Sequence, residues 1–133
     1  MDFNWLKNVG ELFRGRRKVT LDDLQKAHQV ARELGDWLRN VLPLGPEIME
    51  HLTYSQALSY FVEHRPQNQR IVKGAMLLQP HAQGRLLVQV FLDHSNELVC
   101  GQDGKPFGRR VVVRRLDEEL LDTFGGKDLV IVE

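Results

Sequence analysis

The residues whose spacing best matches a known chemistry are two aspartates and a lysine. Asp93 ends an apolar run, and nine residues separate it from Asp103-Gly-Lys105. Metal-dependent nucleases hold Mg²⁺ between an Asp on one strand and the acid of an (Asp/Glu)-x-Lys motif on the next, and the Lys positions the attacking water. Asp-Gly-Lys-Pro is also a common turn sequence, and Gly104 and Pro106 disfavour a strand. We therefore expect a turn, with a Mg-dependent nuclease as the weaker alternative.

The other candidates for metal or covalent chemistry lack the required spacing. The five histidines show no His-x-x-x-His pair, and Cys100 is the single cysteine. A zinc site would need His81, His94 and Cys100 to meet across adjacent strands, whereas structural zinc is typically held by paired Cys or His ligands. No glycine-rich phosphate loop or nucleophile elbow is present. We expect no metal, no cofactor and no catalytic residue.

Arginine is the residue type with the most uneven distribution. Residues 109–115 read Arg-Arg-Val-Val-Val-Arg-Arg, so a strand here would point Arg110 and Arg114 to one side and Arg109 and Arg115 to the other. These arginines could border a central valine triplet and pair with the acids of residues 117–122. They could equally form a basic stripe that meets phosphate or an acidic partner.

A second basic cluster follows an amphipathic segment at the start of the chain. Phe3, Leu6, Val9 and Phe13 recur at intervals of three or four, and the cluster that follows consists of Arg14, Arg16, Arg17 and Lys18. Residues 1–18 therefore predict an amphipathic helix and a basic connector. An interfacial membrane anchor has this composition, but the helix is short and carries few cations, which disfavours a membrane surface. Docking on the rest of the domain or on a second copy is the preferred interpretation.

The helical part that should position these residues is expected over residues 20–65. Thr20 is suited to cap a long amphipathic helix that ends before Pro43, with a nearly heptad-like apolar stripe. Pro46 then suits the start of a short helix through residue 51. Thr53 and Gln56 match a capping box, and Leu58, Phe61 and Val62 are expected on the buried side of the helix that follows.

The sheet part is expected over residues 70–133. Apolar and β-branched runs predict strands at 71–79, 85–92, 97–101 and 109–115. Their short connections make them antiparallel neighbours. Residues 117–122 are expected to form a short helix that stops at Gly125-Gly126, followed by a last strand at 129–132. This last strand could pair at either edge of the sheet. The predicted fold is α+β: N-terminal helices packed on a 4–5-stranded, mostly antiparallel meander sheet, with a short helix before the last strand.

Length and composition limit the class of protein. A chain of 133 residues predicts a single domain over residues 1–133. Lys and Arg number 18 and Asp and Glu number 18, which argues against bulk attraction to nucleic acid. The single cysteine fits a reducing compartment, and no apolar run approaches the roughly 20 residues that span a bilayer. We expect a cytoplasmic protein.

These observations favour a small non-enzymatic protein-interaction or regulatory module over an enzyme. It would bind a partner through the Arg-rich strand, an apolar helix face, or both. The candidate partner-binding residues are Arg109, Arg110, Arg114, Arg115, Arg16 and Arg17. A protein is the favoured partner, and homodimerisation is plausible. The main alternative is a nucleic-acid-binding protein that uses residues 14–18 and 109–115.

Overall fold

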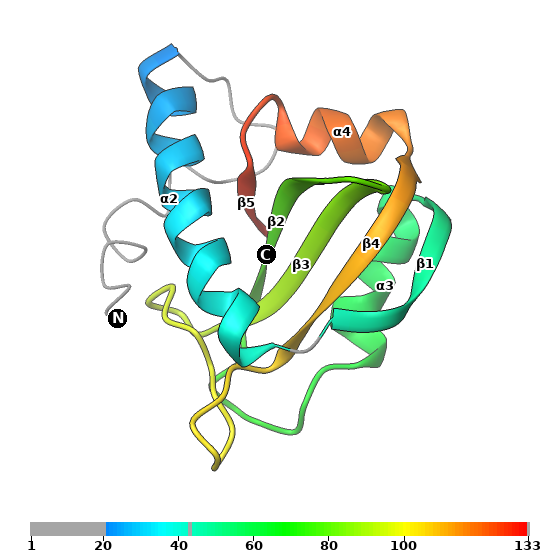
Figure 1. Ribbon diagram of the computed structural model, residues 1–133. Coiled ribbons are helices and arrows are strands. Elements are labelled where there is room, and N and C mark those ends of the chain that lie inside the picture. Colours follow the sequence, from blue (N-terminus) through cyan, green and yellow to red (C-terminus); the bar gives the residue numbers. More distant parts are fainter. Residues whose placement is uncertain (1–20, 43, 133) are drawn as a thin grey trace.

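Helices lie on both faces of one mixed sheet, so the fold is α+β (Figure 1). The computed structural model describes residues 21–42 and 44–132. In chain order, its elements are α2 (Leu21–Val41), β1 (Leu44–Leu52), α3 (Tyr54–Glu63), β2 (Lys73–His81), β3 (Gly84–Leu92), β4 (Gly108–Leu116), α4 (Glu118–Phe124) and β5 (Leu129–Val132). The predicted amphipathic segment over residues 2–14 and the basic residues Arg16 and Arg17 lie outside the described part of the chain.

The sheet is not a meander, which corrects the prediction. Its strand order is β1-β4-β3-β2-β5. β1 runs parallel to β4, whereas β4 with β3, β3 with β2 and β2 with β5 are antiparallel pairs. The long connection from β1 through α3, β2 and β3 supplies the crossover that a parallel pair requires. The predicted packing of N-terminal helices on a meander is therefore also wrong, because strand β1 separates α2 from α3.

β1 occupies the place of the short helix predicted to start at Pro46. Ile48 packs against the cluster beneath α2, and Met49 packs against the cluster beneath α3. This alternation between two apolar faces is what a strand provides and a single helical turn does not. Pro46 is tolerated because β1 is an edge strand whose register with β4 shifts between Leu44 and Ile48. Tertiary packing thus overrides the local helix signal.

The predicted strand at 97–101 is also wrong. This segment makes only isolated bridges, between Leu92 and Leu98 and between Cys100 and Pro106. Asn96 adopts a left-handed conformation with φ 64°, and the Asp93 side chain holds its turn by accepting hydrogen bonds from the backbone N–H groups of Ser95 and Glu97. The irregular segment after β3 is therefore longer than the sequence pattern indicates.

Two helix ends follow the predicted signals, the capping box at Thr53 and the glycine stop at Gly125, whereas Asp117, expected in the first turn of its helix, is the N-cap. The Thr53 side chain accepts from the backbone N–H of Gln56, and the Gln56 side chain accepts from the backbone N–H of Thr53, which confirms the capping box. Asp117 caps α4 by accepting from the N–H of Leu120 at 2.8 Å. Gly125 ends this helix in a left-handed conformation with φ 56°, where glycine carries no steric cost.

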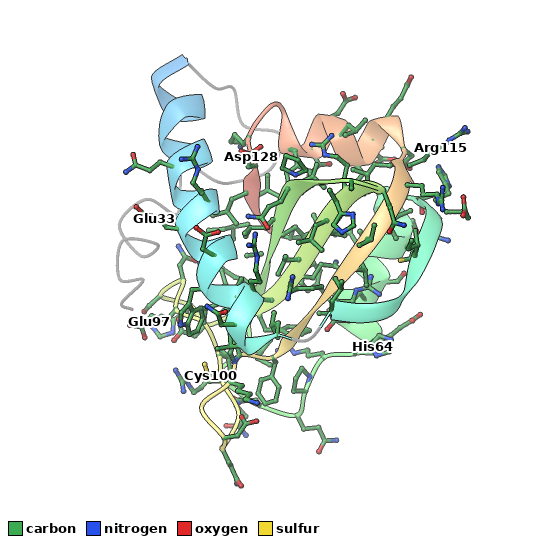
Figure 2. All side chains as sticks on the ribbon, viewed as in Figure 1. Glu33, His64, Glu97, Cys100, Arg115 and Asp128 are labelled. Atoms are coloured by element: carbon green, nitrogen blue, oxygen red, sulfur yellow. The ribbon has the colours of Figure 1, made fainter. Side chains whose placement is uncertain are left out.

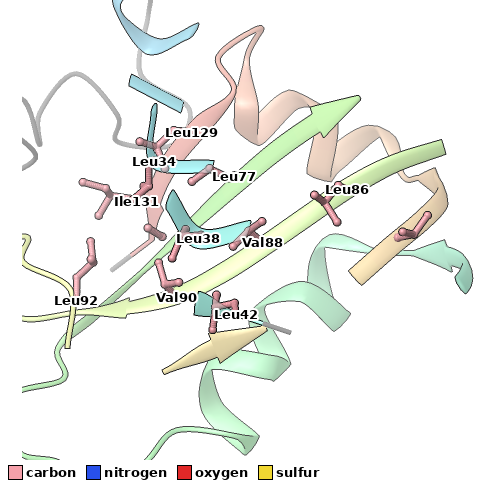
Figure 3. Packing of buried hydrophobic residues seen from close by; sticks show 12 residues of the cluster. Leu34, Leu38, Leu42, Leu77, Leu86, Val88, Val90, Leu92, Leu129 and Ile131 are labelled. Atoms are coloured by element: carbon pink, nitrogen blue, oxygen red, sulfur yellow. The ribbon is translucent and has the colours of Figure 1, made fainter. Parts of the chain in front are cut away.

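The first core cluster lies between α2 and the sheet. Leu34 and Leu38 of α2, with Leu42 just after its end, are buried against side chains of β2, β3 and β5 (Figure 3). Within the described residues, no helix combines the length and the apolar character needed to cross a bilayer.

The second core cluster lies on the opposite face, under α3 and α4, which lie behind and above the sheet in Figure 1. Ala57 of α3 and Phe124 of α4 are both buried there. The ring of Phe61 covers Gly74 on β2, where a side chain would have no room: a Cβ at position 74 would lie 2.5 Å from Phe61 Cε1. The same ring meets Phe91 edge-to-face with 5.6 Å between centroids. Gly74 therefore sets how closely α3 approaches the sheet.

Replacing Gly74 with Ala should lower the free energy of unfolding by about 1–3 kcal/mol, because the new methyl group forces the Phe61 ring out of its position. Urea denaturation measures this change. The double variant Gly74→Ala/Phe61→Leu should lose less free energy of unfolding than the sum of the losses in the two single variants. The smaller Leu side chain leaves space for the methyl group. Additive costs would show that the Phe61 ring does not limit the space at position 74.

Candidate functional site

The carboxylates of Asp93 and Asp103 each accept hydrogen bonds within their own turns. Asp93 is buried, and its Oδ1 accepts from the backbone N–H groups of Ser95 at 2.8 Å and Glu97 at 3.0 Å. Its Oδ2 lies 3.4 Å from a guanidinium nitrogen of Arg70. Asp103 Oδ1 accepts from the backbone N–H of Lys105 at 3.0 Å in an exposed turn. Among the described residues, no three His, Cys, Asp or Glu side chains are grouped so as to hold a metal ion, His81, His94 and Cys100 included.

The charge of Asp93 stabilises its turn. Burial by itself raises the pKa of Asp93, but the hydrogen bonds from Glu97 and Ser95 and the contact with Arg70 together lower it below its ordinary value. A carboxyl whose pKa is lowered in the folded state stabilises that state fully above its unfolded pKa of about 3.9. This stabilisation is lost as the pH falls through the lower folded value.

Asp93→Asn should therefore lower the free energy of unfolding by about 1.5 kcal/mol at neutral pH, because the amide retains an acceptor but loses the charge. The difference between variant and wild type should shrink as the pH falls below about 4. Chemical denaturation at a series of pH values measures both quantities. A difference that stays constant down to the acid limit would mean that the Asp93 charge contributes nothing.

The arginines of β4 are divided between the two faces of the sheet, as strand alternation predicts. Arg110 points toward α2, where its Nη1 donates to the carbonyl oxygens of Leu42 at 2.9 Å and Arg39 at 3.2 Å. It therefore caps the C-terminal end of α2. Burial and the neighbouring Arg39 charge both lower the pKa of Arg110, so the cation is held there against an electrostatic cost.

The two outer arginines of β4 are exposed. Arg114 Nε lies 3.1 Å from Glu50 Oε1 of β1, and both side chains are largely open to solvent. Arg115 lies at the far end of β4, where it points away from the sheet (Figure 2). Such exposed charges contribute little to stability. The structure thus does not combine the four arginines into one stripe.

Replacing Arg110 with Met should lower the free energy of unfolding by about 1 kcal/mol, because two carbonyl oxygens at the end of α2 lose their donor. Arg115→Met is the matched control on the same strand and should change it by less than about 0.5 kcal/mol. Thermal unfolding followed by circular dichroism compares the two. Equal effects at both positions would remove the capping role.

Arg109 is the one β4 arginine that lies beneath α3. Its Nε donates to Gln89 Oε1 at 2.7 Å, and its guanidinium lies 4.2 Å from the centre of the Tyr60 ring. Gln89 is fully buried, and its Nε2 donates to the carbonyl oxygen of Ala57 in α3 at 2.8 Å. Burial lowers the pKa of Arg109, and burial raises that of Tyr60 against the opposing effect of the Arg109 charge. Arg109 is therefore a half-buried, oriented cation.

On the other flank of α3 lies an apolar groove that the sequence interpretation missed. Val62 was expected on the buried side of the helix, but it is 77% exposed. Tyr54, Leu58 and Val62 follow one another at intervals of four and line the groove together with Val72, which is 50% exposed. The signal was available: residues 57, 60 and 61 already supply a stripe that packs on the sheet, which leaves 54, 58 and 62 as a second apolar stripe.

The rim of this groove is cationic. Lys73 Nζ donates to Asn96 Oδ1 at 2.8 Å, and Arg65 donates to the carbonyl oxygen of Ile71. Both side chains line the groove, and no Asp or Glu is among the described residues that do so. The arrangement offers an apolar surface beside two positive charges.

No protein-family model, no curated protein and no solved structure matches this chain.

Proposed function

We propose that this chain is a non-enzymatic protein-interaction module that docks an apolar segment of a partner protein in the groove beside α3. The observation that carries the proposal is the exposure of Val62 and Val72 beside a hollow of about 270 Å³. Large apolar side chains grouped at a concave surface are typical of binding sites, whereas isolated ones need no explanation. Phe61 and Phe91 form the packed aromatic base beneath them.

The charge at the rim indicates what kind of segment fits. Lys73 and Arg65 lie at the groove, and no carboxylate among its described lining residues opposes them. A partner segment with two or three apolar anchors and an acidic flank is complementary to this surface, because its carboxylates would meet the rim cations. An apolar segment with a basic flank would be repelled.

The alternatives have less support. A nucleic-acid-binding surface built on β4 is weakened because Arg110 caps α2 and Arg114 pairs with Glu50. A nuclease is weakened because Asp93 and Asp103 are engaged in their own turns. A second copy of the chain remains the alternative occupant of the groove, and the experiment below separates it from a foreign segment.

Selection of displayed random peptides against the full chain tests the proposal. Enriched peptides should combine spaced apolar residues with acidic ones. Val62→Glu should weaken their binding at least tenfold, because it places a charge in the apolar groove and leaves the exposed side of α3 otherwise unchanged. Isothermal calorimetry with one enriched peptide measures the loss.

Leu121→Glu is the matched control, since Leu121 is a 42% exposed leucine on α4, outside the groove. It should leave binding unchanged. Lys73→Glu should weaken the binding of acidic peptides and reduce the salt dependence of their affinity. Equal binding by wild type and Val62→Glu would contradict the proposal. A concentration-dependent dimer that Val62→Glu dissociates, measured by light scattering, would replace the foreign partner with a second copy.

A further inference from the structure

A second groove lies on the opposite flank of α3, between this helix and the strands β1 and β4. Its volume is about 320 Å³. Met49 and Leu52 supply apolar side chains, Ser59, Glu63 and His64 supply polar groups from α3 and its end, and Arg109 reaches it from β4. His64 is visible at the lower end of α3 in Figure 2, far from the exposed Arg115. The groove therefore combines an apolar part with a single arginine.

The protein orients the guanidinium of Arg109 but leaves part of its hydrogen-bonding capacity available. Nε is bound to Gln89, and one flat face lies over Tyr60. Within the described part of the chain, Nη1 and Nη2 have no hydrogen-bond acceptor and Arg109 has no ion-pair partner. Glu63 lines the same groove without forming an ion pair with Arg109 in the structure.

This orientation is costly unless the cation acquires a partner. Holding a half-buried charge away from water is unfavourable, and burial accordingly lowers the pKa of Arg109, although a guanidinium stays protonated at neutral pH. Gln89 is buried at 0% exposure and is paired at both ends of its amide, so the Arg109 side chain cannot turn away without leaving a buried oxygen unpaired. The site is therefore preorganised for an incoming acceptor.

The chemistry of the groove selects among anions. The two Nη groups of an arginine form a planar fork that matches the two oxygens of a carboxylate. Arg109 is the single arginine or lysine among the described lining residues, and Glu63 adds a negative charge. This balance favours a singly charged carboxylate over a dianionic phosphate. Met49 and Leu52 can cover a short apolar body attached to it.

We propose that this groove binds a carboxylate through Nη1 and Nη2 of Arg109, with the apolar body of the ligand against Met49 and Leu52. The carboxylate can belong to a small organic acid or to the terminus of a partner polypeptide, and both present the same chemistry. The proposal does not depend on the apolar groove on the other flank of α3, since the two grooves are lined by different sides of the helix.

Nuclear magnetic resonance of the arginine Nε–Hε groups in the full chain tests the proposal. Titration with butyrate should shift the Arg109 signal saturably, in the millimolar range expected for a ligand of this size. Butyramide has the same shape without the charge and should leave this signal in place. Sodium chloride at matched ionic strength should also leave the Arg109 signal in place. Equal shifts with butyrate and butyramide, or with butyrate and sodium chloride, would overturn the proposal.

Variants locate the site. Arg109→Lys keeps the charge but loses the fork, so butyrate affinity should fall at least fivefold. Arg115→Gln removes an exposed arginine of the same strand and should leave affinity unchanged. Glu63→Gln removes the competing carboxylate and should keep or tighten binding; loss of binding in this variant would overturn the proposal. If the Arg109 variants unfold, the shift of the Arg109 signal by butyrate in wild type and in Glu63→Gln still tests the proposal.

Two further ligands identify the class and the source. Inorganic phosphate should bind more weakly than butyrate, and tighter phosphate binding would overturn the assignment to a carboxylate. A peptide ending in a free carboxylate is compared with the same peptide ending in an amide. Tighter binding of the free acid than of butyrate supports a partner terminus as the source, whereas binding of butyrate alone supports a small organic acid.

Discussion

The buried amide of Gln89 fixes α3 to the sheet, and the surface around α3 depends on it. Its Nε2 donates to Ala57 of the helix, and its Oε1 accepts from Arg109 of β4. Because Gln89 is fully buried, losing either partner would leave a polar atom without a hydrogen bond, at a cost of about 1–3 kcal/mol. One side chain therefore sets the positions of a helix, a strand and a guanidinium relative to one another.

This constraint explains why α3 exposes apolar side chains. The helix has one apolar side around Ala57 and Phe61 and another at Leu58 and Val62. Apolar packing is non-directional and would allow the helix to rotate toward a compromise between the two sides. The hydrogen bond from Gln89 to Ala57 and the contact of Phe61 with Gly74 hold the helix in an orientation that leaves Val62 exposed. Exposure of Val62 is thus a consequence of directional contacts elsewhere.

Capping signals located the ends of α3 and α4. Thr53 with Gln56 and Asp117 with Gly125 mark helix ends by hydrogen bonds within a few residues, and both helices lie where these residues indicate. Long-range pairing was not predictable in the same way. The helix signal of Pro46 was outweighed by pairing of β1 with β4, whose residues lie some sixty positions further along the chain. Nothing in the local pattern reports such a partner.

The same distinction applies to the candidate site. Strand alternation divides the arginines of β4 between the two faces, but alternation gives no information about what each arginine meets. Arg110 meets the end of α2, and Arg109 meets a glutamine and a tyrosine that are distant in sequence. Identical residue types in one short strand thus become a helix cap and an oriented cation. The difference comes from the elements packed on each face, so a run of basic residues in a sequence does not by itself establish a basic surface.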